Sequence, residues 1–384
     1  MKNKALLTIF LVVFIDLLGF GIILPLLPFI AEKYSANPLQ IGLLTATYSL
    51  FQLLATPVFG RLSDRFGRKK LLILSQLGSV AGYLLLGFAN SLPLLFLARI
   101  IDGATGGNIS VAQAYIADVT DKRNRARGMG LISAAFGLGF IIGPAVGGLL
   151  SVYGFAAPAF AAAGVGLVTV LATALFLKET VNTRAALHSP RTAFSWKEIK
   201  RVLGLYPIGL LIGTFFILNF AFSVMQGNFA LFTQAAFHFG ARDNGWLFAY
   251  MGVLIVIIQL WVLPMLVKRT HEKRLLLVAI ASLATAFILL PIVPAAQWMW
   301  FIMLFFAFGN GLSNPTIMAI ASEHVPKEEY GETLGIVQSA GSLGRIVGPV
   351  VGGELFFLFG RNVPFFFAAG LAIFIGTYLW VKLR

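Results

Sequence analysis

Cysteine is absent from this chain of 384 residues, and charged residues make up only 11% of it. Without cysteine, disulfides, thiolate metal sites and thiol nucleophiles are excluded. Histidine is also scarce, and each of the four lies in or next to a predicted loop: His188, His238, His271 and His324. The chain therefore lacks the residues for a metal cluster or a nucleophile–base pair in a helix core, and we expect neither an enzyme nor a cofactor.

Apolar side chains are in excess. Hydrophobic residues make up 58% of the chain, with 36 phenylalanines and a mean hydropathy of +0.88, against about 45–50% apolar residues in typical soluble domains. Apolar runs of about 20 residues recur, without the alternation typical of membrane β-strands. The sequence predicts an all-α integral membrane protein with twelve spans, at about 6–30, 40–60, 71–90, 94–117, 127–150, 156–177, 206–232, 246–267, 274–293, 298–321, 333–357 and 363–381.

The basic residues predict the topology. If the amino terminus is cytoplasmic, only Lys33, Arg242 and Arg361 lie outside and only Arg99 and Arg345 lie in the membrane, whereas all other Lys and Arg face the cytoplasm. This positive-inside pattern explains the net charge of +14 without a nucleic-acid partner. The first span is too long for a signal-peptide core, so we expect a retained helix. Short loops and the lack of an external glycosylation site indicate a bacterial inner membrane with both termini cytoplasmic.

The longest connection, Lys178 to Leu205, divides the chain into an N-terminal half (1–180), a cytoplasmic linker (181–205) and a C-terminal half (206–384). In the linker, "SWKEIKRVLG" has Ser195 and Glu198 at capping-box spacing, which predicts a short amphipathic helix. A shift of 205 residues aligns "LISAAFGLGFIIGPAVGGLL" (131–150) with "IVQSAGSLGRIVGPVVGGEL" (336–355), and half of these positions are identical. Two parallel-related six-helix halves are typical of alternating-access transporters.

Three motifs resemble those of a known family. "GRLSDRFGRKK" (60–70) lies between spans two and three, "ARIIDGATGG" (98–107) in span four and "GLGFIIGPAVGG" (137–148) in span five. They resemble the loop signature, the Arg-and-Gly motif and the antiporter motif of the major facilitator superfamily, and residues 98–140 are especially similar to its tetracycline-efflux type of drug/proton antiporter. The resemblance spans the chain and implies the major facilitator fold and efflux by antiport. The sequence departs from those exporters because it has no acid in span three and no histidine in a helix core.

The loop motif also has a physical interpretation. A single surface ion pair contributes only about 0–1 kcal/mol, but a cluster that breaks and re-forms can bias two conformations, and the resemblance implies that role. The alternative is a loop that only sets topology. We predict a cytoplasmic gate in which the charges of the motif pair with an acid at the end of span four: Gly60, Asp64, Arg65, Gly67, Arg68 and Asp118.

Small residues recur every four positions in span five, so one face of that helix is bare backbone and permits close packing. A proline in the same span removes a backbone N–H and allows a kink. The predicted packing and hinge positions are Gly139, Gly143, Pro144, Gly147 and Gly148, with Gly348 and Pro349 in the second half.

Four charged residues lie deep in predicted spans: Asp16, Arg99, Asp102 and Arg345. Each costs about 2.5–3.5 kcal/mol at the bilayer centre, so we expect them to share one cavity. A carboxyl group can bind and release a proton, and burial and a neighbouring guanidinium act on it in opposite directions. Asp16, Asp102 and Arg99 are therefore predicted to couple protons to transport. Two alternatives stay open: a permanent Arg99–Asp102 salt bridge, and Arg345 as counter-ion to Asp16 rather than as an anchor for anionic substrate groups.

Polar residues among many phenylalanines suit amphipathic organic substrates. For any one of them, an interhelical hydrogen bond is the alternative role. We expect a monomer that exports such compounds by proton antiport, with a small-molecule substrate, the proton and the lipid bilayer as its partners. Proton-coupled uptake, lipid-like export and a non-transporting receptor are the alternatives. The predicted substrate-cavity residues are Arg345, Asn108, Gln113, Asn219, Gln226, Asn310, Asn314 and Gln338.

Overall fold

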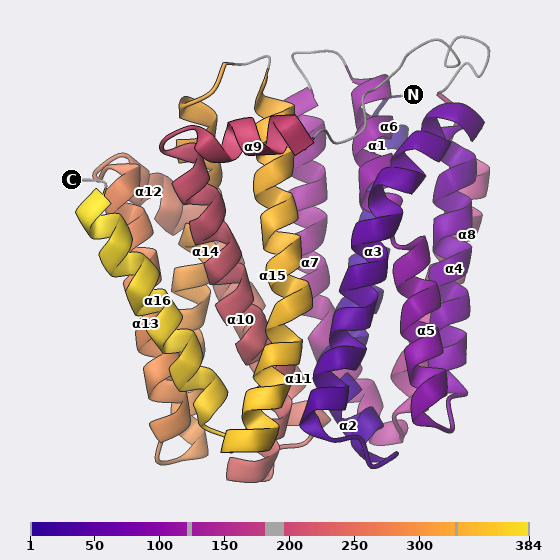
Figure 1. Cartoon of the computed structure of the whole chain (residues 1–384). Helices are drawn as coiled ribbons and strands as arrows, with labels where there is room; N and C mark the ends of the chain where they lie inside the picture. The colour runs from indigo at the N-terminus through magenta and orange to yellow at the C-terminus, as the bar shows by residue number, and fades with distance from the viewer. Residues whose placement is uncertain (1, 121–124, 181–195, 327–328, 383–384) are drawn as a thin grey trace. The chain divides into compact units, whose positions relative to one another are not determined.

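A computed structural model describes residues 2–120, 125–180, 196–326 and 329–382, and the regular elements in these ranges are all helical (Figure 1). The chain divides into two compact units. Unit 1 comprises Met1–Ala36, Thr47–Pro190 and Gly240–Ala249, and unit 2 comprises Asn37–Ala46, Arg191–Phe239 and Tyr250–Arg384. The division of the chain into two six-helix halves, with boundaries at residues 180 and 205, stays a prediction.

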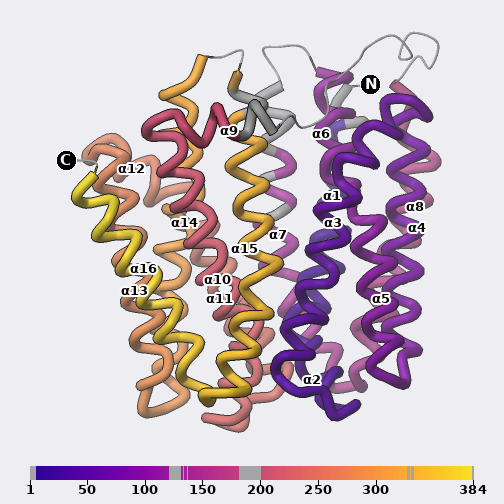
Figure 2. The backbone as a smooth tube through the Cα atoms, in the orientation of Figure 1, coloured from indigo at the N-terminus to yellow at the C-terminus, as the bar shows by residue number. Residues whose placement is uncertain are grey.

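Figure 2 shows the path of the helices along the chain. The first series is α1 (Lys2–Ile23), α2 (Leu27–Glu32), α3 (Pro38–Phe66), α4 (Arg68–Gly87), α5 (Leu92–Thr105), α6 (Asn108–Val119), α7 (Arg125–Leu150) and α8 (Ala156–Phe176). The second series is α9 (Trp196–Gly204), α10 (Ile208–Phe237), α11 (Ala241–Ile257), α12 (Leu263–Val267), α13 (Glu272–Ile292), α14 (Met299–Glu323), α15 (Tyr330–Phe359) and α16 (Val363–Lys382). A π-helical turn, Ile258–Val262, joins α11 to α12.

The all-α membrane fold is confirmed. In the described residues, ten helices are long and apolar enough to cross a bilayer. Helix also occupies the remaining two predicted spans, as the α5–α6 pair and as α7, whose apolar stretch is shorter. In the predicted linker, α9 forms at "WKEIKRVLG", whereas Ser195 of the expected capping box lies outside the described residues.

Two predicted spans are interrupted, which corrects the expectation of one helix in each. The first helix ends at Ile23, because Pro25 lacks an N–H and disfavours helical backbone at the preceding residue, and α2 starts beyond it. The fourth span breaks at Gly106 and Gly107. There α3 approaches closely: a Cβ on Gly107 would lie 2.5 Å from Cβ of Phe59.

Unit 1 is built on close helix pairs. Helix α7 packs along α1, where a Cβ on Gly143 would lie 2.8 Å from Cα of Gly21. Helix α4 packs on both α5 and α8. Apolar side chains such as Ile9, Val13 and Ile116 fill the space between the elements. This packing encloses the polar side chains described below.

Unit 2 repeats the close pairing. Helix α15 packs along α10, where a Cβ on Gly348 would lie 2.7 Å from the carbonyl oxygen of Phe220. Helix α13 packs on α14 and α16, and the rings of Phe287 and Phe306 meet edge to face at 5.1 Å. Helix α9 packs against α10.

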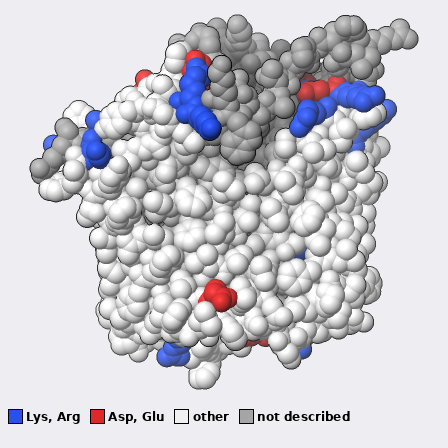
Figure 3. Space-filling view, viewed as in Figure 1, with Lys and Arg blue, Asp and Glu red and all other residues white. Residues whose placement is uncertain are grey.

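The outer surface is strongly apolar. In the view of Figure 3, the middle of the face is almost free of charge, and Lys and Arg gather toward its edges. Large apolar side chains such as Leu175, Val168 and Trp261 are exposed. Such a surface suits contact with lipid tails, which solvate apolar side chains but cannot form hydrogen bonds with polar groups.

Candidate functional site

Helix α5 carries a buried ion pair. Nη1 of Arg99 lies 3.3 Å from Oδ2 of Asp102, and the two residues are only 2% and 1% exposed. Their spacing of three residues places both side chains on one helix face. Helix α4 closes over them, since a Cβ on Gly82 would lie 2.8 Å from Cβ of Asp102.

The remainder of the Arg99 guanidinium faces an aromatic ring. Its Cζ lies 5.8 Å from the ring centroid of Tyr48, on α3. The Nε and Nη2 atoms make no hydrogen bond within the described part of the chain. The charge of Arg99 is therefore compensated mainly by Asp102, with a smaller cation–π contribution.

Asp16 comes to this pair from α1. The Asn108 amide of α6 and the Ser79 hydroxyl of α4 lie near its half-buried carboxyl, although neither polar atom of the Asn108 side chain makes a hydrogen bond within the described residues. Asp102 lies close enough for the two carboxylate charges to repel each other. Ser79 also interacts with Asp102. Because a hydroxyl has one proton to donate, Ser79 can donate to only one carboxylate at a time. The structure thus brings together Asp16, Arg99 and Asp102, the three residues predicted to couple protons.

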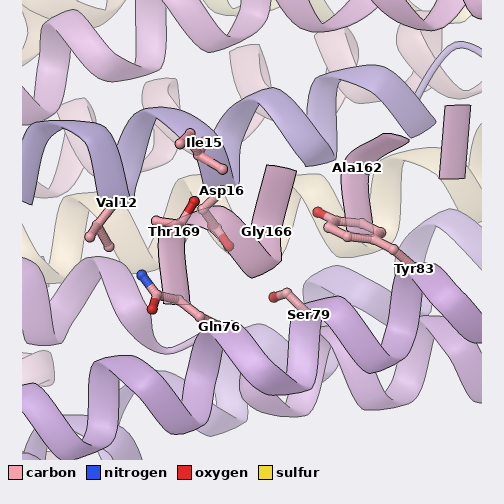
Figure 4. A pocket seen from close by; sticks show the side chains of 9 residues that line it. All are labelled: Val12, Ile15, Asp16, Gln76, Ser79, Tyr83, Ala162, Gly166 and Thr169. Atoms are coloured by element: carbon pink, nitrogen blue, oxygen red, sulfur yellow. The ribbon is translucent and has the colours of Figure 1, made fainter. Parts of the chain in front are cut away.

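A small cavity adjoins Asp16 inside unit 1 (Figure 4). It leaves about 10 Å³ for the centre of a water molecule, near the minimum for one water. Three helices line it: α1 with Val12, Ile15 and Asp16, α4 with Gln76, Ser79 and Tyr83, and α8 with Ala162, Gly166 and Thr169. The α4 residues were missed in the sequence, although their spacing of three and four residues marks a polar face on one helix.

The predicted cavity residues lie on α6, α10, α14 and α15. Asn108 is fully buried beside Asp16, and Gln113 is exposed on the same helix, α6. In unit 2, Asn310 accepts a hydrogen bond from Asn314 at 3.1 Å on α14. Gln226 on α10 is half-buried, and Gln338 on α15 is exposed.

Arg345 is an exposed residue in the middle of α15. Its Nη2 donates to the Ser342 hydroxyl at 2.8 Å, and its Nη1 approaches the Asn219 side-chain oxygen at 3.4 Å. Both contacts lie within unit 2. They orient the guanidinium while leaving part of it accessible. A shared cavity with the acids of unit 1 stays a prediction.

The predicted gate centres on Arg68, at the start of α4. Its guanidinium is buried, pairs with Asp64, lies 3.1 Å from Asp118 through Nε, and donates to the Ser63 hydroxyl at 2.6 Å through Nη1. Gly67 makes the turn from α3 to α4 with a φ of 107°, a conformation that suits glycine. Of the other two predicted residues, Arg65 is exposed over the ring of Phe66 and Gly60 is half-buried.

Glu179 completes this cluster and was missed in the sequence. Its carboxylate accepts the backbone N–H groups of Arg68 at 2.8 Å and Lys69 at 3.2 Å. In addition, Nζ of Lys69 donates a hydrogen bond of 2.6 Å to the carbonyl oxygen of Ala174, in the last turn of α8. A carboxylate at the amino terminus of a helix and a cation at the carboxyl terminus both interact favourably with the helix dipole. The only sequence signal was an acid directly after an apolar span.

The small residues that were predicted to pack helices together lie at close contacts between helices. A Cβ on Gly139 would lie 2.7 Å from Cβ of Leu17, and Gly147 packs against the Ile22 carbonyl. Around the first turn of α11, a Cβ on Gly245 would lie 2.5 Å from the Pro144 carbonyl and 3.0 Å from Cα of Gly148. In unit 2, Pro349 lies 3.1 Å from the position of a Cβ on Gly227.

Comparison with known proteins identifies the family. The model of the Major Facilitator Superfamily matches residues 9–349 and 308–384. The tetracycline resistance protein, class C, of Escherichia coli is 32% identical over 91% of this chain and 89% of its own, and multidrug resistance protein 2 of Bacillus subtilis is 30% identical over 97% and 95%. A bacterial homologue of the human lysosomal transporter Spinster, solved inward-facing and unoccupied, has a TM-score of 0.80 at 15% identity over 99% and 96% of the two chains. The chain belongs to the major facilitator superfamily and is a multi-pass membrane transporter, as the motifs predicted.

Proposed function

We propose that this transporter exports amphipathic organic compounds in exchange for protons, by alternating access. The proposal draws on the names of its relatives, which are resistance proteins for tetracycline and for multiple drugs. It further assigns the chain to a bacterial inner membrane, as a monomer with both termini cytoplasmic, in keeping with the positive-inside pattern.

The observation that carries the proposal is the position of Asp16. It is a carboxyl at about the middle of a membrane helix, beside a cavity and beside a buried ion pair that already engages Asp102. An ionisable residue at that depth is costly unless it serves a pathway for ions or substrate. Asp16 is therefore the proton carrier, and Arg99 with Asp102 supplies the electrostatic field that its protonation changes.

The other predicted residues take supporting roles in the proposal. Arg345 with Asn219 binds polar or anionic groups of the substrate. The cluster of Arg68, Asp64 and Asp118 stabilises one of the two access states and breaks in the other. Close glycine contacts let helix pairs move as rigid bodies.

The test uses inverted membrane vesicles with an imposed proton gradient, reported by a pH-quenched dye, and a panel of lipophilic compounds of different charge. A transported compound collapses the gradient with the wild type and not with Asp16→Asn. Glu354→Gln, which removes a half-buried acid on α15 of unit 2, serves as the matched control and keeps the response. Transport of labelled compound without any change in the gradient contradicts antiport and favours facilitated passage.

A further inference from the structure

The cavity beside Asp16 is unusually polar for the interior of a membrane helix bundle. Five of its nine lining residues carry polar side chains, contributed by α1, α4 and α8 of unit 1: Asp16, Gln76, Ser79, Tyr83 and Thr169. A cavity holds water when it is roomy enough and offers two to four polar partners. This one offers the polar partners, and its volume of about 10 Å³ is at the lower limit for one water.

Gln76 has a hydrogen-bonding requirement that the described residues leave open. The residue is 4% exposed, its Nε2 donates to the Thr173 hydroxyl at 3.0 Å, and its Oε1 accepts no hydrogen bond in the described ranges. A buried acceptor left unsatisfied costs about 1–3 kcal/mol. A water molecule in the cavity would satisfy Oε1 and would be in reach of the Asp16 carboxyl.

We propose that this cavity binds a water molecule between Gln76 and Asp16, and that Asp16 exchanges its proton through this water. The proposal rests on the proposed role of Asp16 as proton carrier and deepens it. In the transfer, the O–H bond of protonated Asp16 breaks, a new O–H bond forms to the water, and the water passes one of its own protons to a further water molecule. Asp16 is left as a carboxylate, and no other group changes its charge.

Several charged or titratable groups face Asp16 from the elements packed around it. Asp102 and Arg99 lie on α5, and Tyr83 lies on α4. Helix α6 contributes the neutral Asn108, and α8 contains no titratable residue between Ala156 and Phe176. No described side chain of α7 that packs on α1 is titratable. The water is thus the route by which Asp16 can lose a proton without first neutralising the Arg99–Asp102 pair.

The water itself is tested by radiolytic footprinting of the purified full-length protein in lipid nanodiscs with ¹⁸O-labelled water. Tyr83 is only 3% exposed, so it acquires label only if a water lies in the cavity. Phe287 and Phe306, which are fully buried in unit 2, serve as internal controls without label. Ala162→Val fills the cavity and lowers labelling of Tyr83 by about tenfold, whereas Ala163→Val, a buried neighbour that does not line it, leaves labelling unchanged. Absence of label on wild-type Tyr83 would overturn the proposal.

The proton route is tested by the rate of substrate-driven collapse of the proton gradient. Ala162→Val slows it by about tenfold at unchanged substrate binding, and Ala163→Val does not. Thr169→Val, which keeps side-chain volume and removes a hydroxyl at the cavity, gives a second test if Ala162→Val folds poorly. If the wild type couples protons and both cavity variants match Ala163→Val, the route is wrong although the proposed function stands. If the wild type moves substrate without protons while Tyr83 is labelled, the proposed function and the exchange role both fail.

Discussion

Arg99 and Asp102 form an ion pair within a single helix, 3.3 Å between Nη1 and Oδ2, with both side chains enclosed in unit 1. Asp16 approaches the same place from α1 and makes no ion pair among the described residues. The two aspartates therefore differ in what their removal leaves behind. Loss of the Asp102 carboxylate leaves the buried Arg99 guanidinium without its counter-ion, whereas loss of the Asp16 carboxylate does not.

Asp102→Asn is expected to lower the free energy of unfolding by about 3–5 kcal/mol, because it leaves the Arg99 guanidinium without its carboxylate in a buried site. Asp16→Asn is nearly isosteric and breaks no ion pair, so its effect stays within about 1 kcal/mol. Thermal unfolding of the purified variants in detergent compares the two. Equal destabilisation by both would show that Asp16 also balances the charge of Arg99.

Glu179→Ala is expected to destabilise the amino end of α4 by about 1–2 kcal/mol, since the first N–H groups of the helix lose their acceptor. Hydrogen exchange of the amides at Arg68 and Lys69 should accelerate accordingly. Glu323→Ala, an exposed acid at the end of α14, is the matched control and should leave these amides unchanged. Unaltered exchange in Glu179→Ala would mean that water replaces the carboxylate without cost.

Gly143→Ala is expected to reduce the yield of folded protein, because the added methyl group would lie 2.8 Å from Cα of Gly21 on α1 and overpack a close helix contact by about 1–3 kcal/mol. Gly164→Ala on α8 meets open space and should be neutral. Size-exclusion chromatography of fluorescently tagged variants measures the yield. Similar yields for both would show that α1 and α7 can separate at this point without loss.

Arg345→Gln is expected to weaken the binding of compounds that carry an anionic group by about tenfold or more, because one charged hydrogen bond to the ligand is lost. Neutral compounds should bind as before. Arg345→Lys keeps the charge and loses the planar fork that Ser342 and Asn219 orient, so its effect should be intermediate. Competition binding with matched anionic and neutral ligands provides the measurement. An equal loss for both ligand types would assign Arg345 to the fold rather than to recognition.

The sequence predicted the helical spans because the bilayer imposes length and apolarity on each of them. It also predicted that the charges of the loop motif pair with Asp118, and in the structure Nε of Arg68 lies 3.1 Å from that carboxylate. It could not reveal Glu179, whose contacts join α4 to residues more than 100 positions away. The spacing of polar residues in the sequence indicated a polar face on α4. That spacing alone does not identify the neighbouring helices against which this face packs. The early end of α1 depended on Pro25, a local effect inside a run that was apolar throughout.

The central claim, that Asp16 carries the proton exchanged for substrate, is tested most directly by proton release from the purified protein. A compound identified with the vesicle panel is added to the wild type in weakly buffered detergent, and a pH indicator reports the protons released on binding. The account predicts release from the wild type and from Glu354→Gln, and none from Asp16→Asn that still binds the compound. Undiminished release from Asp16→Asn would contradict the account and assign the proton to another group.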